Sequence, residues 1–427
     1  MKKLFTLILV VMLLLALAGC GGEPEAPTPN WGSGGSEVPN IIQPPDTLQT
    51  DNVDDTGDEL PRYSIDLEQN PEIPEMPAPT PTVEISVSNE SELRQAVGQS
   101  GNTPVVITIT SDIELISNFI IPDGADITLR SADEPMFNLI VDRSMDVISI
   151  ERNASLRIEN IGIKRVEGTS GSGVFNAGVF TMSGGFISGH TNSGVRSIGI
   201  FTMYGGTISD NVSTLLGSSA RGGGVTINMN GIFTMNGGTI SDNTVRGNGG
   251  GVSVNGTFIM NGGTIRDNVG SGRSFGGGVH IYQGNFIMHG GVISGNTVSN
   301  RGGGVSGGAF TMYGGVISGN TASEGGGVSS GAFTMYGGTI YGNTGTRTGG
   351  GISIGLGVLT IHDGMIHANS GGGVNIEGNG AMTIYGGWIF DNAADNGVDI
   401  RIGGVFNNNI FDANNGAIGN PPPGFAP

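Results

Sequence analysis

The sequence has little of what many folded domains use for charge pairing or covalent bracing. It contains one Cys in 427 residues, and 18 Lys and Arg face 37 Asp and Glu. A single Cys excludes a disulfide scaffold. The formal net charge of −19 excludes a protein that binds nucleic acid through its phosphates. Charged residues make up only 13% of the chain, about half the share usual in a globular domain.

Long apolar runs are also scarce, and the one that exists lies at the N-terminus. Leu4 to Leu17 follows a basic start and closes with Leu17-Ala18-Gly19-Cys20. A basic start and a short apolar run are typical of a secretory signal. The closing tetrapeptide resembles a bacterial lipobox, in which the Cys becomes the lipidated first residue of the mature chain. We therefore expect a lipoprotein signal peptide over 1–19 and a membrane anchor at Cys20. Gly21, where an acid would favour retention at the inner membrane, favours the cell surface or outer membrane.

Residues 20–85 have the composition of a spacer. They are rich in Pro, Gly, Ser, Thr and acids, and 21–92 contains 16 acids against one base, Arg62. Such a segment has too few apolar residues to offset the entropy of ordering. We expect a disordered acidic tether that holds most of the chain's negative charge, so the charge does not indicate a cation site in the folded part.

Glycine is abundant, with 80 residues, but it does not fall at every third position, which excludes a collagen. Instead the Gly residues belong to a repeat of about 25 residues that occurs nine times. Each repeat is anchored by an apolar-x-apolar triplet. The triplets begin at Phe180, Phe201, Phe233, Phe258, Phe286, Phe310, Phe333, Leu359 and Met382.

Positions within a repeat are given as offsets, counted from the first residue of the triplet. The residue types at fixed offsets predict short strands and tight bends. Alternation in Phe-Thr-Met has period two, a Gly pair follows at offsets four and five, and an Ile always stands at offset seven. A Gly-Gly-Gly-Val segment opens a further strand. Three strands and three bends per repeat describe one coil of a parallel β-helix. No segment sustains a helical period, and a propeller blade would need about 40 residues.

The predicted architecture is therefore all-β: a right-handed parallel β-helix of about 12 coils. Residues 86–166 hold an N-terminal cap and irregular first coils, with a helix over 91–97 capped by Asn89 or Ser91. Residues 167–418 hold the regular coils, and 419–427 form a C-terminal tail.

Offset ten is Asn in eight of the nine repeats, and we expect these side chains to form a structural ladder along the stack. His190 takes the slot in the first repeat. The eight residues are Asn211, Asn243, Asn268, Asn296, Asn320, Asn343, Asn369 and Asn392.

The unit Phe-Thr-Met-x-Gly-Gly-x-Ile-Ser-x-Asn, followed by Gly-Gly-Gly-Val, resembles the coils of the pectate-lyase-like superfamily. It is most similar to bacterial surface lipoproteins and adhesin-like proteins of that fold, over residues 85–418. The resemblance implies the fold strongly and an activity weakly, because one fold hosts many functions.

Three groups of residues are candidates for chemistry. Asp210, Asp242 and Asp267 occupy offset nine in consecutive coils and form a weak candidate for Ca²⁺, although Asp-Asn is also ordinary turn chemistry. His362, Asp363 and His367 are the nearest approach to an acid–base or metal cluster. Outward aromatic and His residues gather in the last coils and are candidates for binding glycan, or for packing against each other. These residues are Tyr313, Tyr336, Tyr341, His362, His367, Tyr385 and Trp388, and Phe390 continues the column of Tyr341 and His367.

The sequence favours a lipid-anchored, non-enzymatic surface protein that presents an adhesive or glycan-binding face. We assign no catalytic residue, cofactor or metal, and we expect a monomer whose partners are the membrane and a glycan or host-cell surface. The alternative is a polysaccharide lyase or hydrolase on the same fold. An enzyme would concentrate non-repeat acids and bases in one groove, whereas this chain stays close to its repeat.

Overall fold

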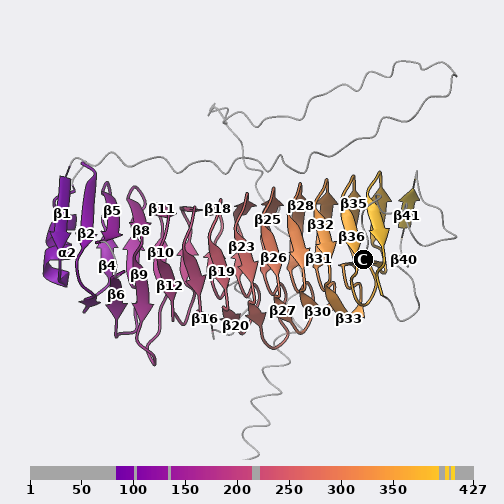
Figure 1. The fold of residues 1–427 in the computed structure, drawn as a ribbon, viewed down its shortest axis with the longest axis horizontal. Helices are drawn as coiled ribbons and strands as arrows, with labels where there is room; N and C mark the ends of the chain where they lie inside the picture. Colours follow the sequence, from indigo (N-terminus) through magenta and orange to yellow (C-terminus); the bar gives the residue numbers. More distant parts are fainter. Residues whose placement is uncertain are drawn as a thin grey trace, which may run out of the picture. The chain divides into compact units, whose positions relative to one another are not determined.

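The computed structural model describes residues 83–100, 103–132, 136–213, 222–393, 400–402 and 405–408. These residues form a parallel β-solenoid of about 12 turns, as the repeat predicts (Figure 1). All strand pairs named below are parallel, and each strand pairs with its equivalents in the coils before and after it. For example, Phe201 lies in register with Phe180 on one side and Phe233 on the other.

The largest sheet has 23 strands and holds two series. The anchor series is β1 (Val83–Val87), β2 (Val105–Ile109), β5 (Asp126–Ser131), β8 (Ser155–Glu159), β11 (Val179–Met182), β14 (Ile200–Met203), β18 (Ile232–Met235), β22 (Thr257–Met260), β35 (Val358–Ile361), β38 (Ala381–Ile384) and β41 (Val405–Asn408). The other series is β4 (Phe119–Ile121), β7 (Ile148–Ile150), β10 (Val174–Asn176), β13 (Val195–Ser197), β17 (Val225–Ile227), β21 (Val252–Val254), β34 (Ile352–Ile354), β37 (Val374–Ile376) and β40 (Ile400–Ile402). Three long strands run through both series: β25 (Val279–Met288), β28 (Val305–Met312) and β31 (Val328–Met335).

The second sheet has 12 strands and carries the Ile of offset seven. Its strands are β3 (Ile113–Leu115), β6 (Asn138–Val141), β9 (Gly162–Arg165), β12 (Phe186–Ser188), β15 (Thr207–Ser209), β19 (Thr239–Ser241), β23 (Thr264–Arg266), β26 (Val292–Ser294), β29 (Val316–Ser318), β32 (Thr339–Tyr341), β36 (Met365–His367) and β39 (Trp388–Phe390).

A third sheet of six short strands follows the Asn of offset ten, and the sequence analysis did not predict it. Its strands are β16 (Val212–Ser213), β20 (Thr244–Val245), β24 (Val269–Gly270), β27 (Thr297–Val298), β30 (Thr321–Glu324) and β33 (Thr344–Thr348). These strands are only two to five residues long and vary in sequence, so they leave no periodic signal.

The core is one continuous cluster that runs through the coils. The Phe and Met of each anchor strand are buried and the Thr between them is not, as the alternation predicts. Seven consecutive anchors are Phe, whose rings stack with centroids 4.5 to 4.9 Å apart. They are Phe180, Phe201, Phe233, Phe258, Phe286, Phe310 and Phe333.

The second Gly of each Gly pair is the one that the bend requires. Gly238 has φ +84°, and a Cβ there would lie 2.5 Å from Cε of Met203. The first position needs no positive φ, although a Cβ at Gly237 would lie 2.4 Å from the carbonyl oxygen of Tyr204. Asp363 replaces Gly at this first position, while Gly364 is kept with φ +114°.

The N-terminal end is covered by α2 (Glu90–Val97), one residue longer than predicted. Asn89 caps it by accepting a hydrogen bond from the Glu92 amide, 3.1 Å away, and Leu93 is fully buried against the first coils. Strand β1 begins at Val83, so the last three residues of the stretch expected to be tether belong to the first strand. Among the described residues, no helix is long and apolar enough to cross a membrane.

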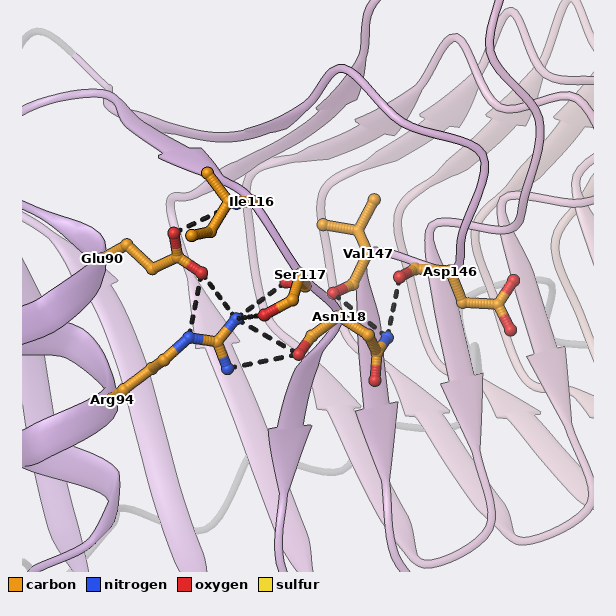
Figure 2. Close-up of polar contacts among 7 residues, drawn as sticks. All are labelled: Glu90, Arg94, Ile116, Ser117, Asn118, Asp146 and Val147. Atoms are coloured by element: carbon orange, nitrogen blue, oxygen red, sulfur yellow. Dashed lines mark hydrogen bonds and ion pairs between the residues drawn. The ribbon is translucent and has the colours of Figure 1, made fainter.

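A polar network fastens α2 to the first coils (Figure 2). Arg94 forms an ion pair with Glu90, 2.6 Å away, and donates to the main-chain oxygens of Ser117 and Asn118. Asn118 in turn donates to the carbonyl of Asp146 in the next coil, 2.7 Å away. Burial raises the pKa of Glu90, but hydrogen bonds from Ile116 and Arg94 outweigh it and lower that pKa. Glu90 is therefore ionised at neutral pH and holds the cap in place.

Candidate functional site: polar and aromatic columns

The eight Asn of offset ten form a continuous buried ladder, here called the Asn ladder. Each Nδ2 donates to Oδ1 of the Asn in the next coil over 2.8 to 3.0 Å. That Oδ1 also accepts the main-chain N–H of the preceding Asn, as for Asn268 and Asn296 at 3.0 Å. The second proton of Nδ2 reaches the carbonyl of the Ile one coil back. Every rung is therefore paired within the protein, and the ladder has a structural role.

His190 heads the Asn ladder and is completely buried. Its amide donates to Oδ1 of Asn211 over 3.1 Å, and its Nε2 lies 3.1 Å from the carbonyl of Ile163. A carbonyl only accepts, so Nε2 carries the proton; among the described residues Nδ1 has no hydrogen-bond partner. Burial lowers the pKa of His190 to about 3.

The head of the ladder should therefore make the fold sensitive to acid. Because the folded pKa of about 3 lies below the unfolded value of 6.5, the unfolded chain binds the proton first. Stability is full above pH 6.5 and falls as the pH drops towards 3. At pH 4.5 this one residue should cost roughly 2 to 3 kcal/mol relative to pH 7. His190→Asn, which continues the ladder, should remove that part of the loss, as measured by urea unfolding at both pH values. If His190→Asn loses as much stability between pH 7 and pH 4.5 as the unchanged protein does, the acid sensitivity lies elsewhere.

The three Asp of offset nine sit at a backbone position that explains their presence. Asp210, Asp242 and Asp267 have φ between +55° and +58°, in the left-handed region that Asp and Gly tolerate. In three later coils the same slot is Gly, with φ from +63° to +66°. Asp267 forms an ion pair with Arg266, 2.6 Å away, and Asp210 accepts from the Ser209 hydroxyl over 2.7 Å. These contacts match the turn interpretation given above as the alternative to Ca²⁺.

The candidate His and Asp of the last coils do not converge on one point. His362 lies at the end of an anchor strand, next to Asp363, whose carboxylate accepts the amide of Gly364. His367 lies on β36 in the second sheet, in register with Tyr341 and Phe390. No group of three or more His, Cys, Asp or Glu able to hold a metal ion occurs in the described part of the chain.

Two ladders of stacked rings lie on the outward sides of the strands, and the second one ends at Phe390, which is buried. The first, at offset three, has ring centroids 4.5 to 5.0 Å apart and planes within 12° of parallel. Its members are His289, Tyr313, Tyr336, His362 and Tyr385. The second, at offset eight, has centroids 5.1 to 5.4 Å apart. Its members are Tyr341, His367 and Phe390, with Trp388 on the same strand as Phe390.

The sequence analysis found all these residues except His289, which begins the first ladder. The repeat pattern is sufficient to identify His289, because it stands at offset three of its repeat like the other members of the first ladder. Burial lowers the pKa of His289 and of His367, so both imidazoles are largely neutral at pH 7. Three Tyr of the first ladder remain 43% to 52% exposed, so the ladder is a surface ridge.

The stacking determines which atoms of these rings a sugar could contact. Stacking of a sugar on a ring would need an exposed ring face. The faces instead cover each other along the ladder, so solvent meets ring edges, hydroxyls and imidazole nitrogens. Aromatic packing between coils, the second interpretation above, therefore holds for the interior of both ladders.

The structure also contains a pocket that the sequence analysis missed. A cavity of about 420 Å³ lies on the outer side of the largest sheet, beside β25, β28 and β31, and is lined among others by Phe275, His280, Tyr282 and Arg301. The available signal was the number of residues between the Gly-Gly-Gly-Val segment and the next anchor, which changes from coil to coil.

Comparison of the chain with protein-family models, curated proteins and solved structures found no match. The solenoid is therefore established by the structure alone, and the resemblance to the pectate-lyase-like superfamily stays a prediction. Cys20, the expected tether up to residue 82, and the tail over 419–427 lie outside the described residues.

Proposed function

We propose that this protein is a lipid-anchored, non-enzymatic cell-surface protein whose β-solenoid holds out an interaction face for glycan. The observation that carries the proposal is the first aromatic ladder: five rings at one slot of five consecutive coils, with its Tyr side chains about half exposed. Earlier coils hold Ser183, Asn236 and Asn261 in that slot, so the fold does not require rings there.

The chemistry of the ridge suits a linear ligand rich in hydroxyl groups. Tyr hydroxyls and imidazole nitrogens repeat at the coil spacing of about 4.8 Å, and each can donate or accept. Stacked rings are rigid, so binding orders few side-chain torsions. A glycan lying along the ridge would thus meet a row of fixed hydrogen-bond partners, with free ring faces only at the two ends of the ladder.

Replacing Tyr336, Tyr385 and Trp388 together by Ser should lower glycan binding at least tenfold, because two hydroxyl sites and the adjoining indole are lost. The measurement is a glycan array followed by calorimetry with the best ligand, using the purified full-length protein. Circular dichroism should show an intact β-solenoid. Tyr204→Ser is the matched control, since Tyr204 holds the same slot between Ser183 and Asn236, outside the ladder. Unchanged binding in the triple variant, or equal loss in the control, would remove the ladder from the proposal.

The anchor is tested separately. Cys20→Ser should move the protein from the membrane fraction to the soluble or unprocessed fraction and abolish labelling by a radioactive fatty acid. Several acyl chains hold a protein firmly, since each buried CH₂ contributes about 0.8 kcal/mol. A Ser variant that still takes up the label would contradict the lipobox interpretation.

A further inference from the structure

The cavity beside β25, β28 and β31 arises from unequal connector lengths. Six residues lie between Val279 and Phe286, and six between Ile352 and Leu359. In the two coils between them the connectors Ser306–Ala309 and Ser329–Ala332 have only four residues, and β28 and β31 run through without a break. The short connectors form a floor of Ser and Gly, and the longer ones rise at either end.

Apolar side chains stand at both ends of this floor. The register of β25 shifts between Ile281 and Asn285, and Tyr282 lies in that bulge with 47% of its surface exposed. At the other end Leu356 is 86% exposed, the highest value among the exposed large hydrophobic residues. Phe275 forms a side wall and stacks on His280 with ring centroids 6.0 Å apart. A Leu this exposed at the mouth of a cavity gains little for folding, but it would contribute to binding an apolar group.

The other side of the cavity carries positive charge. Glu324 is buried and holds two guanidinium groups, with Nε of Arg301 at 2.7 Å and Nη1 of Arg347 at 3.0 Å. Two Arg against one carboxylate leave a net charge of about +1. Arg301 lines the cavity, its side chain is half exposed, and its closest contact with Glu324 is made through Nε. A guanidinium held by its Nε presents its terminal nitrogens as a pair of parallel donors, which match a carboxylate.

His280 adds a buried polar group to the wall. It is 6% exposed, its Nδ1 lies 2.8 Å from the Ser306 hydroxyl, and its Nε2 has no hydrogen-bond partner among the described residues. The neighbouring coils hold Ser253 and Ser306 in register with it. The fold therefore accepts a small side chain here, and an imidazole with an unpaired nitrogen costs stability unless something pairs with it.

We propose that this cavity binds a small carboxylate with an aromatic or aliphatic body. The body lies over the Ser and Gly floor between Tyr282, Leu356 and Phe275, and the carboxylate pairs with the terminal nitrogens of Arg301. The volume of about 420 Å³ falls in the range of small-molecule sites. The site lies apart from both aromatic ladders, and its residues are not those of the proposed glycan ridge.

The test is calorimetric titration of the full-length protein with indole-3-acetate, with indole-3-acetamide and glucuronate as companion probes. We expect indole-3-acetate to bind, the neutral amide to bind at least tenfold more weakly, and glucuronate, which lacks the apolar body, to bind as weakly as the amide. Arg301→Gln should weaken indole-3-acetate binding about ten- to hundredfold. Arg266→Gln is the matched control, because Arg266 also pairs with a carboxylate but lies on β23, and it should change binding less than twofold.

Leu356→Asp is a second binding variant, chosen because a loss of binding in Arg301→Gln would carry no information if that variant had unfolded. The side chain is exposed, so the fold should tolerate the change, while the new carboxylate should repel the ligand and lower its affinity at least tenfold. Equal binding of acid and amide, or unchanged binding in Arg301→Gln, would overturn the assignment of Arg301. Equal binding of glucuronate and indole-3-acetate would contradict the claim that the ligand needs an apolar body. No binding of indole-3-acetate at millimolar concentration would contradict the proposal that the cavity is a binding site.

Discussion

Phe258→Ala should be the most damaging single change in the solenoid, lowering local stability by about 4 kcal/mol. The ring is fully buried and stacked between Phe233 at 4.8 Å and Phe286 at 4.7 Å. Ala leaves a cavity that the neighbouring coils fill poorly, because both are fixed by their own strand pairing. Two ring contacts are lost along with the buried area.

The loss should be local, because each coil contacts only its neighbours. Hydrogen exchange should therefore speed up in β18, β22 and β25, while the amides of β5 and β8 keep their protection. Phe258→Leu is the matched control: Leu359 fills the same slot in a later coil, so this variant should lose about 1 to 1.5 kcal/mol. Uniform loss of protection along the whole solenoid would show that it unfolds as one cooperative unit.

The sequence predicted the coil well because each coil repeats the same constraints. Inward Phe, Met and Ile, the Gly bend and the Asn of offset ten recur at fixed offsets, so one repeat is read nine times over. The helix that covers the first coil was also predicted, because Asn89 and the acids of the first turn are local signals.

The parts that escaped prediction depend on differences between neighbouring coils. The short strands after the ladder Asn exist only because two loops happen to run side by side, as Thr244 does with Val269. The cavity exists because connectors of four residues lie between connectors of six, and its Arg301 sits in a loop outside the repeat pattern. The face-to-face stacking of Tyr336 and His362 likewise depends on rotamers, which a pattern of residue types does not specify.

Asn296→Leu should lower stability by about 3 kcal/mol, although Leu has the same number of side-chain heavy atoms with the same branching and is more apolar. The Asn296 side chain donates to Asn320, Ile265 and Ser294 and accepts both the main-chain and side-chain N–H of Asn268. Leu removes all of these bonds at once. Asn268 is then left with buried donors that no water reaches, and each such group costs about 1 to 3 kcal/mol.

Asn153→Leu separates this effect from the general cost of replacing Asn by Leu. Asn153 also donates to a side chain of the preceding coil, Asp123 at 2.8 Å, but both residues are exposed, so water replaces the lost bond. It should cost less than about 1 kcal/mol. Both variants are compared by urea unfolding and by hydrogen exchange of the amides of Asn268 and Asn296, whose acceptors are the ladder oxygens. In Asn296→Leu the amide of Asn268 loses its acceptor and should exchange fastest. If the two variants are equally stable, the rungs contribute no more than surface hydrogen bonds do, and the inward Phe and Ile columns alone hold the coils in register.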